Sequence, residues 1–92
     1  MSAIHRHSDP RTCGATTTVT GQSTVRVNGL FVAVEGDPET HGSGQLVSVS
    51  AGTVRVAGKK VIVVTDQALA DDASHPPPDT YPSGGSGDVS AY

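Results

Sequence analysis

The sequence predicts an all-β fold in which three similar units surround one axis. Valine and threonine are frequent and favour strands, whereas helix signals are nearly absent. Two segments also repeat along the chain: residues 8–14 match residues 36–42 at an offset of 28, and residues 24–29 match residues 53–58 at an offset of 29. A nearly fixed period is typical of a fold built from similar units.

The first complete hairpin is expected at residues 23–37. Residues 24–27 form its outgoing arm, Asn28-Gly29 its tight turn, and residues 30–34 its returning arm. An Asn-Gly pair between two β-rich runs is a strong hairpin signal because both residues tolerate positive φ.

The second and third hairpins are expected to follow the same plan. Residues 52–66 repeat it around an Ala57-Gly58 turn. Residues 85–92 resemble the start of another outgoing arm, and residues 4–9 resemble a returning arm that has no partner of its own. The first and last arms are therefore predicted to pair with each other and to complete a third unit.

Length and composition limit the core and the means of stabilising it. The chain of 92 residues predicts a single domain, residues 1–92, and an aromatic content of 3% leaves few large side chains for its core. A domain of this size usually needs a metal, disulfides or a partner. The single cysteine excludes an internal disulfide, so a metal or an oligomeric partner is expected.

Charge and hydropathy bear on partners and location. The net charge of −3 predicts no binding to nucleic acid. No apolar run typical of a secretory signal follows the N-terminus, and residues 61–64, the longest strongly apolar stretch, are too short to span a bilayer. We therefore expect the chain to be made in the cytoplasm, with a carrier for any later export.

The repeat places a cysteine and a histidine in equivalent loops. Cys13 matches His41, and the interrupted third unit carries His75 in its longer loop. Zinc prefers cysteine and histidine and takes four ligands in a structural site. The fourth candidate is His7, or else His5, which lies about 6.6 Å further from the loop end at a strand rise of about 3.3 Å per residue. This set predicts a structural Zn²⁺, although iron could also occupy it.

Three other interpretations compete for these polar residues. Isolated histidines are often exposed side chains without a ligand, so the metal interpretation depends on the match between Cys13 and His41. A catalytic thiol at Cys13 would need a base and a substrate pocket, for which a small aromatic-poor β chain has little room; we expect no enzyme. Asp9, Asp37 and Asp66 recur at the arm ends, which favours a shared turn role over acid–base catalysis.

Taken in order, these segments resemble the PAAR-repeat family, the tips of contractile injection machines. The resemblance covers nearly the whole chain: the hairpins at 23–37 and 52–66, the Gly-Asp-Pro-x-x-His-Gly loop at 36–42, and the Gly-Ser-Gly-Asp-Val segment at 85–89. The Pro-Ala-Ala-Arg motif that names the family is absent, and Arg6 is the only arginine at a corresponding position.

The resemblance implies a small cone of pseudo-three-fold β-hairpins with a metal-bound tip. In that family three histidines and one cysteine hold zinc near the point, which His7, Cys13, His41 and His75 would supply here. The flat base of the cone sits on a trimeric β-helical central spike, with one copy per spike. The resemblance thus implies a membrane-piercing tip of a phage tail baseplate, assembled into the virion, that meets the target cell envelope transiently.

Two alternatives remain open beside the phage tail. The chain could be a metal-stapled β adaptor module of a type VI secretion or extracellular injection system. It could also be a small thiol enzyme that uses Cys13, in which case the thiol would react with an alkylating reagent without removal of a metal.

Overall fold

The computed structural model describes residues 2–12, 14–40, 44–49, 54–64, 66–69, 81–87 and 89–91. These ranges contain short strands and no helix, which confirms the all-β prediction for them. The strands are β1 (Ser2–Ala3), β2 (Arg26–Val27), β3 (Leu30–Phe31), β4 (Leu46–Val47), β5 (Arg55–Val56), β6 (Lys59–Lys60), β7 (Gln67–Ala68) and β8 (Ser90–Ala91). No helix among the same residues is long and apolar enough to cross a membrane.

Two predicted hairpins are present with the predicted turns. β2 pairs with β3 around Asn28 and Gly29, whose φ angles are 54° and 82°. β5 pairs with β6 around Ala57 and Gly58, at 54° and 80°. Two successive positive φ angles match the right-handed twist of the flanking strands, which is why two-residue turns of this kind close hairpins. Both hairpins have shorter strands than the sequence predicts.

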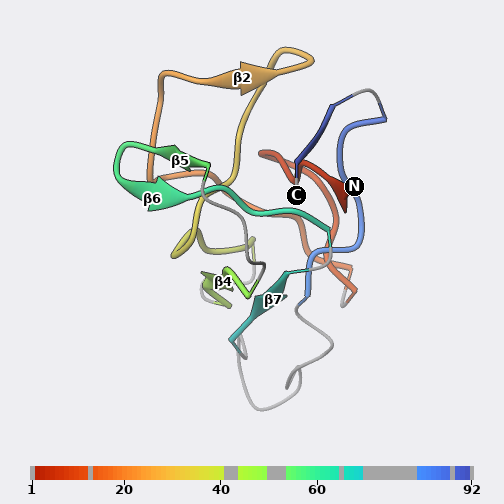
Figure 1. Ribbon diagram of the computed structural model, residues 1–92. Helices are drawn as coiled ribbons and strands as arrows, with labels where there is room; N and C mark the ends of the chain where they lie inside the picture. Colours follow the sequence, from red (N-terminus) through yellow and green to blue (C-terminus); the bar gives the residue numbers. More distant parts are fainter. Residues whose placement is uncertain are drawn as a thin grey trace.

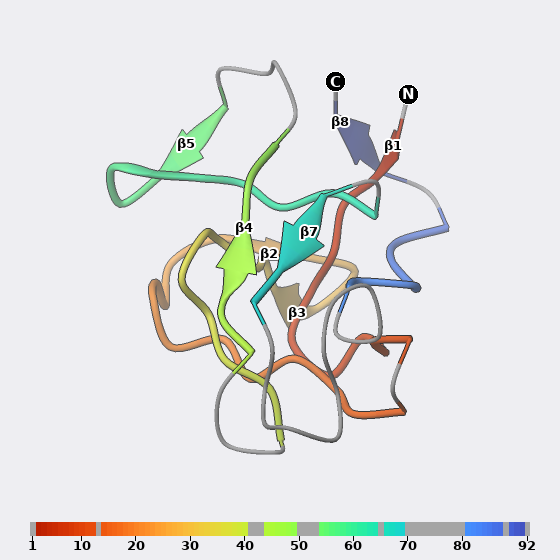
Figure 2. The same ribbon diagram turned by 90° about the horizontal axis from the view of Figure 1, so that it is seen from below.

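The two ends of the chain form the third hairpin, as predicted. β1 pairs antiparallel with β8, so that Ser2 faces Ala91 and Ala3 faces Ser90. Figures 1 and 2 show the two termini side by side at this pairing. The pairing joins the first arm to the last and makes the arrangement of the three units circular.

A fourth pair of strands was not predicted from the sequence. β4 pairs antiparallel with β7, with Leu46 opposite Ala68 and Val47 opposite Gln67. Each segment is short, and neither alternates in hydrophobicity over enough residues to indicate a strand.

The three returning arms meet at the centre of the fold through a closed ring of backbone hydrogen bonds. The N–H of His5 donates to the carbonyl of Ile62, that of Ile62 to Ala33, and that of Ala33 to His5, each at 3.0 Å. All three residues are completely buried. The ring is cyclic because each arm donates to one neighbour and accepts from the other, which gives the backbone a pseudo-three-fold pattern.

Each returning arm ends in the same aspartate turn. The N–H groups of Asp9, Asp37 and Asp66 donate to the carbonyls of Arg6, Val34 and Val63, three residues earlier. In return, Oδ2 of each aspartate accepts the N–H of that same earlier residue, at 2.8, 2.9 and 2.9 Å. This confirms the shared turn role predicted for the three aspartates.

Two small apolar clusters fill the interior. One consists of Ile4, Val32, Val61 and Val63, with Val27 and Val56 of the hairpins packed against it. The other consists of Ala33, Leu46, Ile62 and Ala68, with Val19 and Tyr81 packed against it. Figure 1 shows β2, the β5–β6 hairpin and the chain termini toward one end of the molecule, and β4 and β7 toward the other. We call the first the hairpin end and the second the loop end.

Candidate functional site

Three of the four predicted metal ligands lie outside the described residues. These are Cys13, His41 and His75; only His7 and its alternative His5 can be placed. Among the residues that the structure describes, no three His, Cys, Asp or Glu side chains gather as a metal-binding group. The metal site itself therefore stays a prediction, and the structure bears on it through the residues that flank the three loops.

The described residues that flank the loops of Cys13, His41 and His75 are joined to one another by backbone hydrogen bonds. The N–H of Thr12, just before Cys13, donates to the carbonyl of Tyr81, which follows the third loop. The N–H of Thr40, just before His41, donates to the carbonyl of Thr16 at 2.9 Å, and that of Leu69 donates to Gln45 at 2.9 Å. At each loop root, a residue that precedes the loop thus donates to a residue that follows a neighbouring loop. Together the three bonds form a second cyclic set of hydrogen bonds.

His7 lies in the first aspartate turn, beside the chain that leads to the first hairpin. It is half-buried, and its Nδ1 accepts a hydrogen bond from the N–H of Val19 at 3.0 Å. Because this N–H can only donate, a neutral His7 carries its proton on Nε2. His7 would have to give up the bond from Val19, or shift its proton, before either nitrogen could bind a metal.

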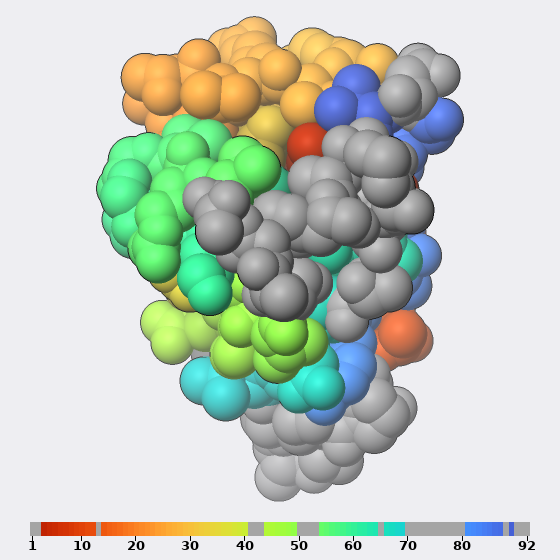
Figure 3. All heavy atoms as spheres, viewed as in Figure 1, coloured from red at the N-terminus to blue at the C-terminus, as the bar shows by residue number. Residues whose placement is uncertain are grey.

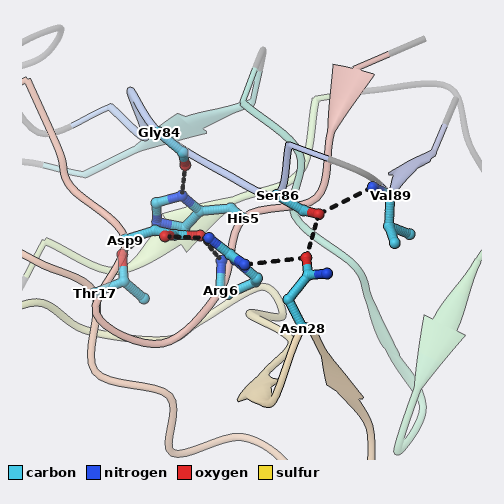
Figure 4. Close-up of polar contacts among 8 residues, drawn as sticks. All are labelled: His5, Arg6, Asp9, Thr17, Asn28, Gly84, Ser86 and Val89. Atoms are coloured by element: carbon cyan, nitrogen blue, oxygen red, sulfur yellow. Dashed lines mark hydrogen bonds and ion pairs between the residues drawn. The ribbon is translucent and has the colours of Figure 1, made fainter.

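His5 has a different role, as a completely buried histidine with two short hydrogen bonds (Figure 4). Its Nδ1 lies 2.6 Å from the carbonyl of Gly84, and its Nε2 lies 2.6 Å from Oγ1 of Thr17. The carbonyl can only accept, so Nδ1 carries the proton and Nε2 accepts from the Thr17 hydroxyl. Both nitrogens are therefore engaged by the protein itself.

Thr17 connects His5 to a buried ion pair between Arg11 and Glu39. Oγ1 of Thr17 accepts from Nε of Arg11 at 2.7 Å, and Nη1 of Arg11 lies 3.4 Å from Oε2 of Glu39. The side chains of Arg11 and Glu39 are both fully buried. Arg11 also donates to the carbonyls of Gly44 and Asp37, at 2.5 and 3.3 Å. The guanidinium thus holds the ends of two loop segments together inside the protein.

A second polar chain joins the terminal segments to the first hairpin (Figure 4). The guanidinium of Arg6 makes two hydrogen bonds to the Asp9 carboxylate, at 2.8 and 3.0 Å, and one to Oδ1 of Asn28 at 3.2 Å. The hydroxyl of Ser86 donates to the same Oδ1 at 2.5 Å and accepts from the N–H of Val89 at 2.9 Å. The turn of the β2–β3 hairpin is thereby attached to the segment that follows β1 and to the segment that precedes β8.

Burial of His5 makes the stability of the fold depend on pH. Burial, opposed by the Gly84 carbonyl and supported by the nearby charge of Arg11, lowers the pKa of His5 from 6.5 to about 4. The unfolded chain binds a proton at this site below pH 6.5, whereas the folded chain does not until about pH 4. As the pH falls from 6.5 to about 4, the free energy of unfolding should therefore decrease by about 3 kcal/mol. Above pH 6.5 the full stability is retained.

Urea denaturation at several pH values, compared between the natural chain and H5N, would measure this dependence. Asparagine can still donate to Gly84 but does not titrate, so H5N should start less stable and lose less stability on acidification. The carboxylates and the other histidines are common to both proteins and cancel in the comparison. Equal slopes for the two proteins would contradict the role assigned to His5.

Arg11, Thr17 and Glu39 were not predicted from the sequence as parts of a site. One signal was present: Arg11 and Glu39 both lie two residues after the aspartate of their unit, and they carry opposite charges at equivalent positions. In a circular arrangement of units, equivalent positions face one another, so an arginine in one and a glutamate in the next indicates an internal pair. Ala68 occupies the same position in the third unit.

Comparison with protein-family models finds no match to this chain, and comparison with curated proteins finds none either.

Proposed function

We propose that this chain is the structural tip of a contractile injection machine, most consistent with a phage tail baseplate, and that it caps a trimeric β-helical spike. One observation carries the proposal: a single chain closes its backbone hydrogen bonds in three-unit cycles, at the His5–Ala33–Ile62 ring and again at the loop roots. A single copy with this pattern can match the end of a homotrimer on its three-fold axis, which an ordinary monomer cannot do.

The hairpin end is the surface proposed to sit on the spike. Val25, Val54 and Val89 occupy equivalent positions there, since their carbonyls accept from the N–H groups of the three returning arms at 3.0 to 3.1 Å. Their exposures are 40%, 49% and 37%. Three partly exposed valines related by the pseudo-three-fold pattern suit contact with three equivalent apolar patches on a trimer.

The loop end is the proposed point of a small cone. There Cys13, His41 and His75 would bind Zn²⁺ together with His7, once His7 gives up its bond from Val19. One thiolate and three imidazoles form a donor set suited to structural zinc, and iron is the alternative. Bound metal would cross-link segments of all three units, and its binding free energy would add to the stability of the fold.

The mechanism proposed for this arrangement is mechanical, and the chain has no catalytic role in it. Contraction of a surrounding sheath would drive the spike forward and apply its force to the target envelope over the small area of the tip. The tip must then resist separation of its loops. Within the described residues that resistance comes from the cyclic hydrogen bonds at the loop roots and from the Arg11–Glu39 pair behind them.

Co-purification with a panel of trimeric β-helical spike proteins tests the proposal. We expect a complex of one chain with one trimer, measured by light scattering. The triple variant V25D/V54D/V89D should bind more than about tenfold more weakly, since burial of each half-exposed valine contributes about 1 kcal/mol. V49D is the matched control, because Val49 is 52% exposed but lies outside the three equivalent positions. Failure to bind any spike, or one chain bound to each subunit, would refute the proposal.

A further inference from the structure

Exposed positive charge is concentrated on two of the three hairpins. Arg26 lies on β2, and Arg55, Lys59 and Lys60 lie on β5 and β6. All are exposed except Lys60, which is half-buried. These are four of the six lysines and arginines in the chain, which has a net charge of −3. The surface of these hairpins is therefore opposite in sign to the protein as a whole.

The other two cations are engaged with carboxylates inside the fold. Arg6 lies 2.8 Å from Asp9, and Arg11 lies 3.4 Å from the buried Glu39. The described carboxylates other than Glu35 are all buried: Asp9, Asp37, Glu39 and Asp66. Glu35 is half-buried, and its Oε1 accepts from the backbone N–H of Lys60 at 3.2 Å. Within the described ranges, little negative charge is thus exposed near the four hairpin cations.

The two basic hairpins are adjacent, and their arginines are held in place. Nζ of Lys59 lies 3.5 Å from the carbonyl of Gly21, in the segment that leads to β2. In Figure 3 the orange atoms around β2 and the green atoms of the β5–β6 hairpin form one continuous surface. The Arg26 guanidinium stacks 4.3 Å from the ring centre of Phe31, and Arg55 donates to the carbonyl of Gly58 at 3.1 Å. Such ordering lowers the entropy lost when these side chains bind a partner.

The two strands of the third hairpin contain no charged residue. Its strands consist of Ser2 and Ala3 in β1 and of Ser90 and Ala91 in β8. Arg26 and Arg55 thus correspond to a serine, and Lys60 corresponds to an alanine. The backbone follows a pseudo-three-fold pattern, whereas the positively charged strand residues lie in only two of the three hairpins.

From these observations we propose that the two basic hairpins dock against carboxylate-rich edges of the trimeric partner, an inference that rests on the proposed function. On a homotrimer the three acidic edges are equivalent. Two edges would face the Arg26 hairpin and the Arg55–Lys59–Lys60 hairpin, and the third would face β1 and β8, whose residues are uncharged. Charge attraction then strengthens and accelerates docking, while the valines supply the apolar contact.

Titration of the ¹⁵N-labelled full chain with poly-L-glutamate tests for this surface without requiring a spike. We expect NMR shifts centred on β2, β5 and β6, and binding at least tenfold weaker when salt rises from about 50 to about 200 mM, because added ions screen exposed charges. R55E/K59E should weaken binding at least tenfold, whereas R55K/K59R, which keeps both charges, should bind like the natural chain.

Three outcomes of this titration would overturn the inference. One is absence of shifts at these strands in low salt. Another is preferential binding of poly-L-lysine, which the net negative charge alone would favour. The third is tighter binding of a DNA duplex than of poly-L-glutamate, which would identify a nucleic-acid surface.

Binding to a spike separates this inference from the proposed function. If a spike binds with no effect of salt or of R55E/K59E, this inference fails while the proposed function stands. If no spike binds, the proposed function fails even where poly-L-glutamate binds.

Discussion

A chelator is expected to unfold the domain by removing the metal proposed for its tip. Structural zinc contributes about 10 kcal/mol or more in small metal-dependent domains, whereas a whole domain is stable by about 5–15 kcal/mol. The described interior consists mainly of valine, alanine and isoleucine with a buried ion pair. It therefore has little buried apolar surface to make up for the loss of metal-binding free energy. Circular dichroism during titration with EDTA, together with elemental analysis of the untreated protein, would measure the effect.

Substitution of the ligands should have the same result as chelation. C13S/H41Q should lose both the metal and the folded spectrum, and H7Q should show whether His7 or another group completes the site. D72N is the matched control, since it changes a charge in the same segment as His75 and should keep the metal. A folded protein that contains neither zinc nor iron would contradict the proposal of a metal-bound tip.

Replacement of Arg11 by methionine is expected to destabilise the fold by about 3–5 kcal/mol. The substitution leaves the buried Glu39 carboxylate without its cation, which is the costly way to break a buried pair. It also removes the hydrogen bonds that the guanidinium donates to the carbonyls of Gly44 and Asp37. Urea denaturation of R11M would measure the loss.

The double variant R11M/E39L separates the charge from the packing. Removing both charges avoids an unpaired ion, so the double variant should be more stable than R11M even though it contains more substitutions. R55M is the surface control and should change stability by less than about 0.5 kcal/mol. If R11M and R55M had the same stability, Arg11 would not have the structural role inferred from its contacts.

The hairpins were predictable because their signals are local. Asn28-Gly29 lies between two strand-forming runs, and the repeat transfers the same plan to Ala57-Gly58. The turn role of Asp9, Asp37 and Asp66 was predictable for a similar reason, since each aspartate bonds to a residue only three positions earlier. The pairing of β1 with β8 required one further step, namely that two incomplete units complete each other.

The candidate site was less predictable because its contacts are distant in sequence. His5 approaches Gly84 across almost the whole chain, and no local pattern indicates that contact. The sequence left His5 and His7 as alternatives for the fourth ligand. The structure gives them different surroundings: both ring nitrogens of His5 are engaged in the interior, whereas His7 is half-buried and its Nδ1 accepts the N–H of Val19.

The class of fold, the turns and the repeated units could be predicted, since they depend on local conformational preference and on a period that is visible in the sequence. Which residues meet at the centre depends instead on how the units pack against one another. A circular arrangement brings equivalent positions face to face, so a difference between units becomes a contact. In this way Arg11 meets Glu39, and two hairpins with basic strands lie beside one whose strands contain no charged residue.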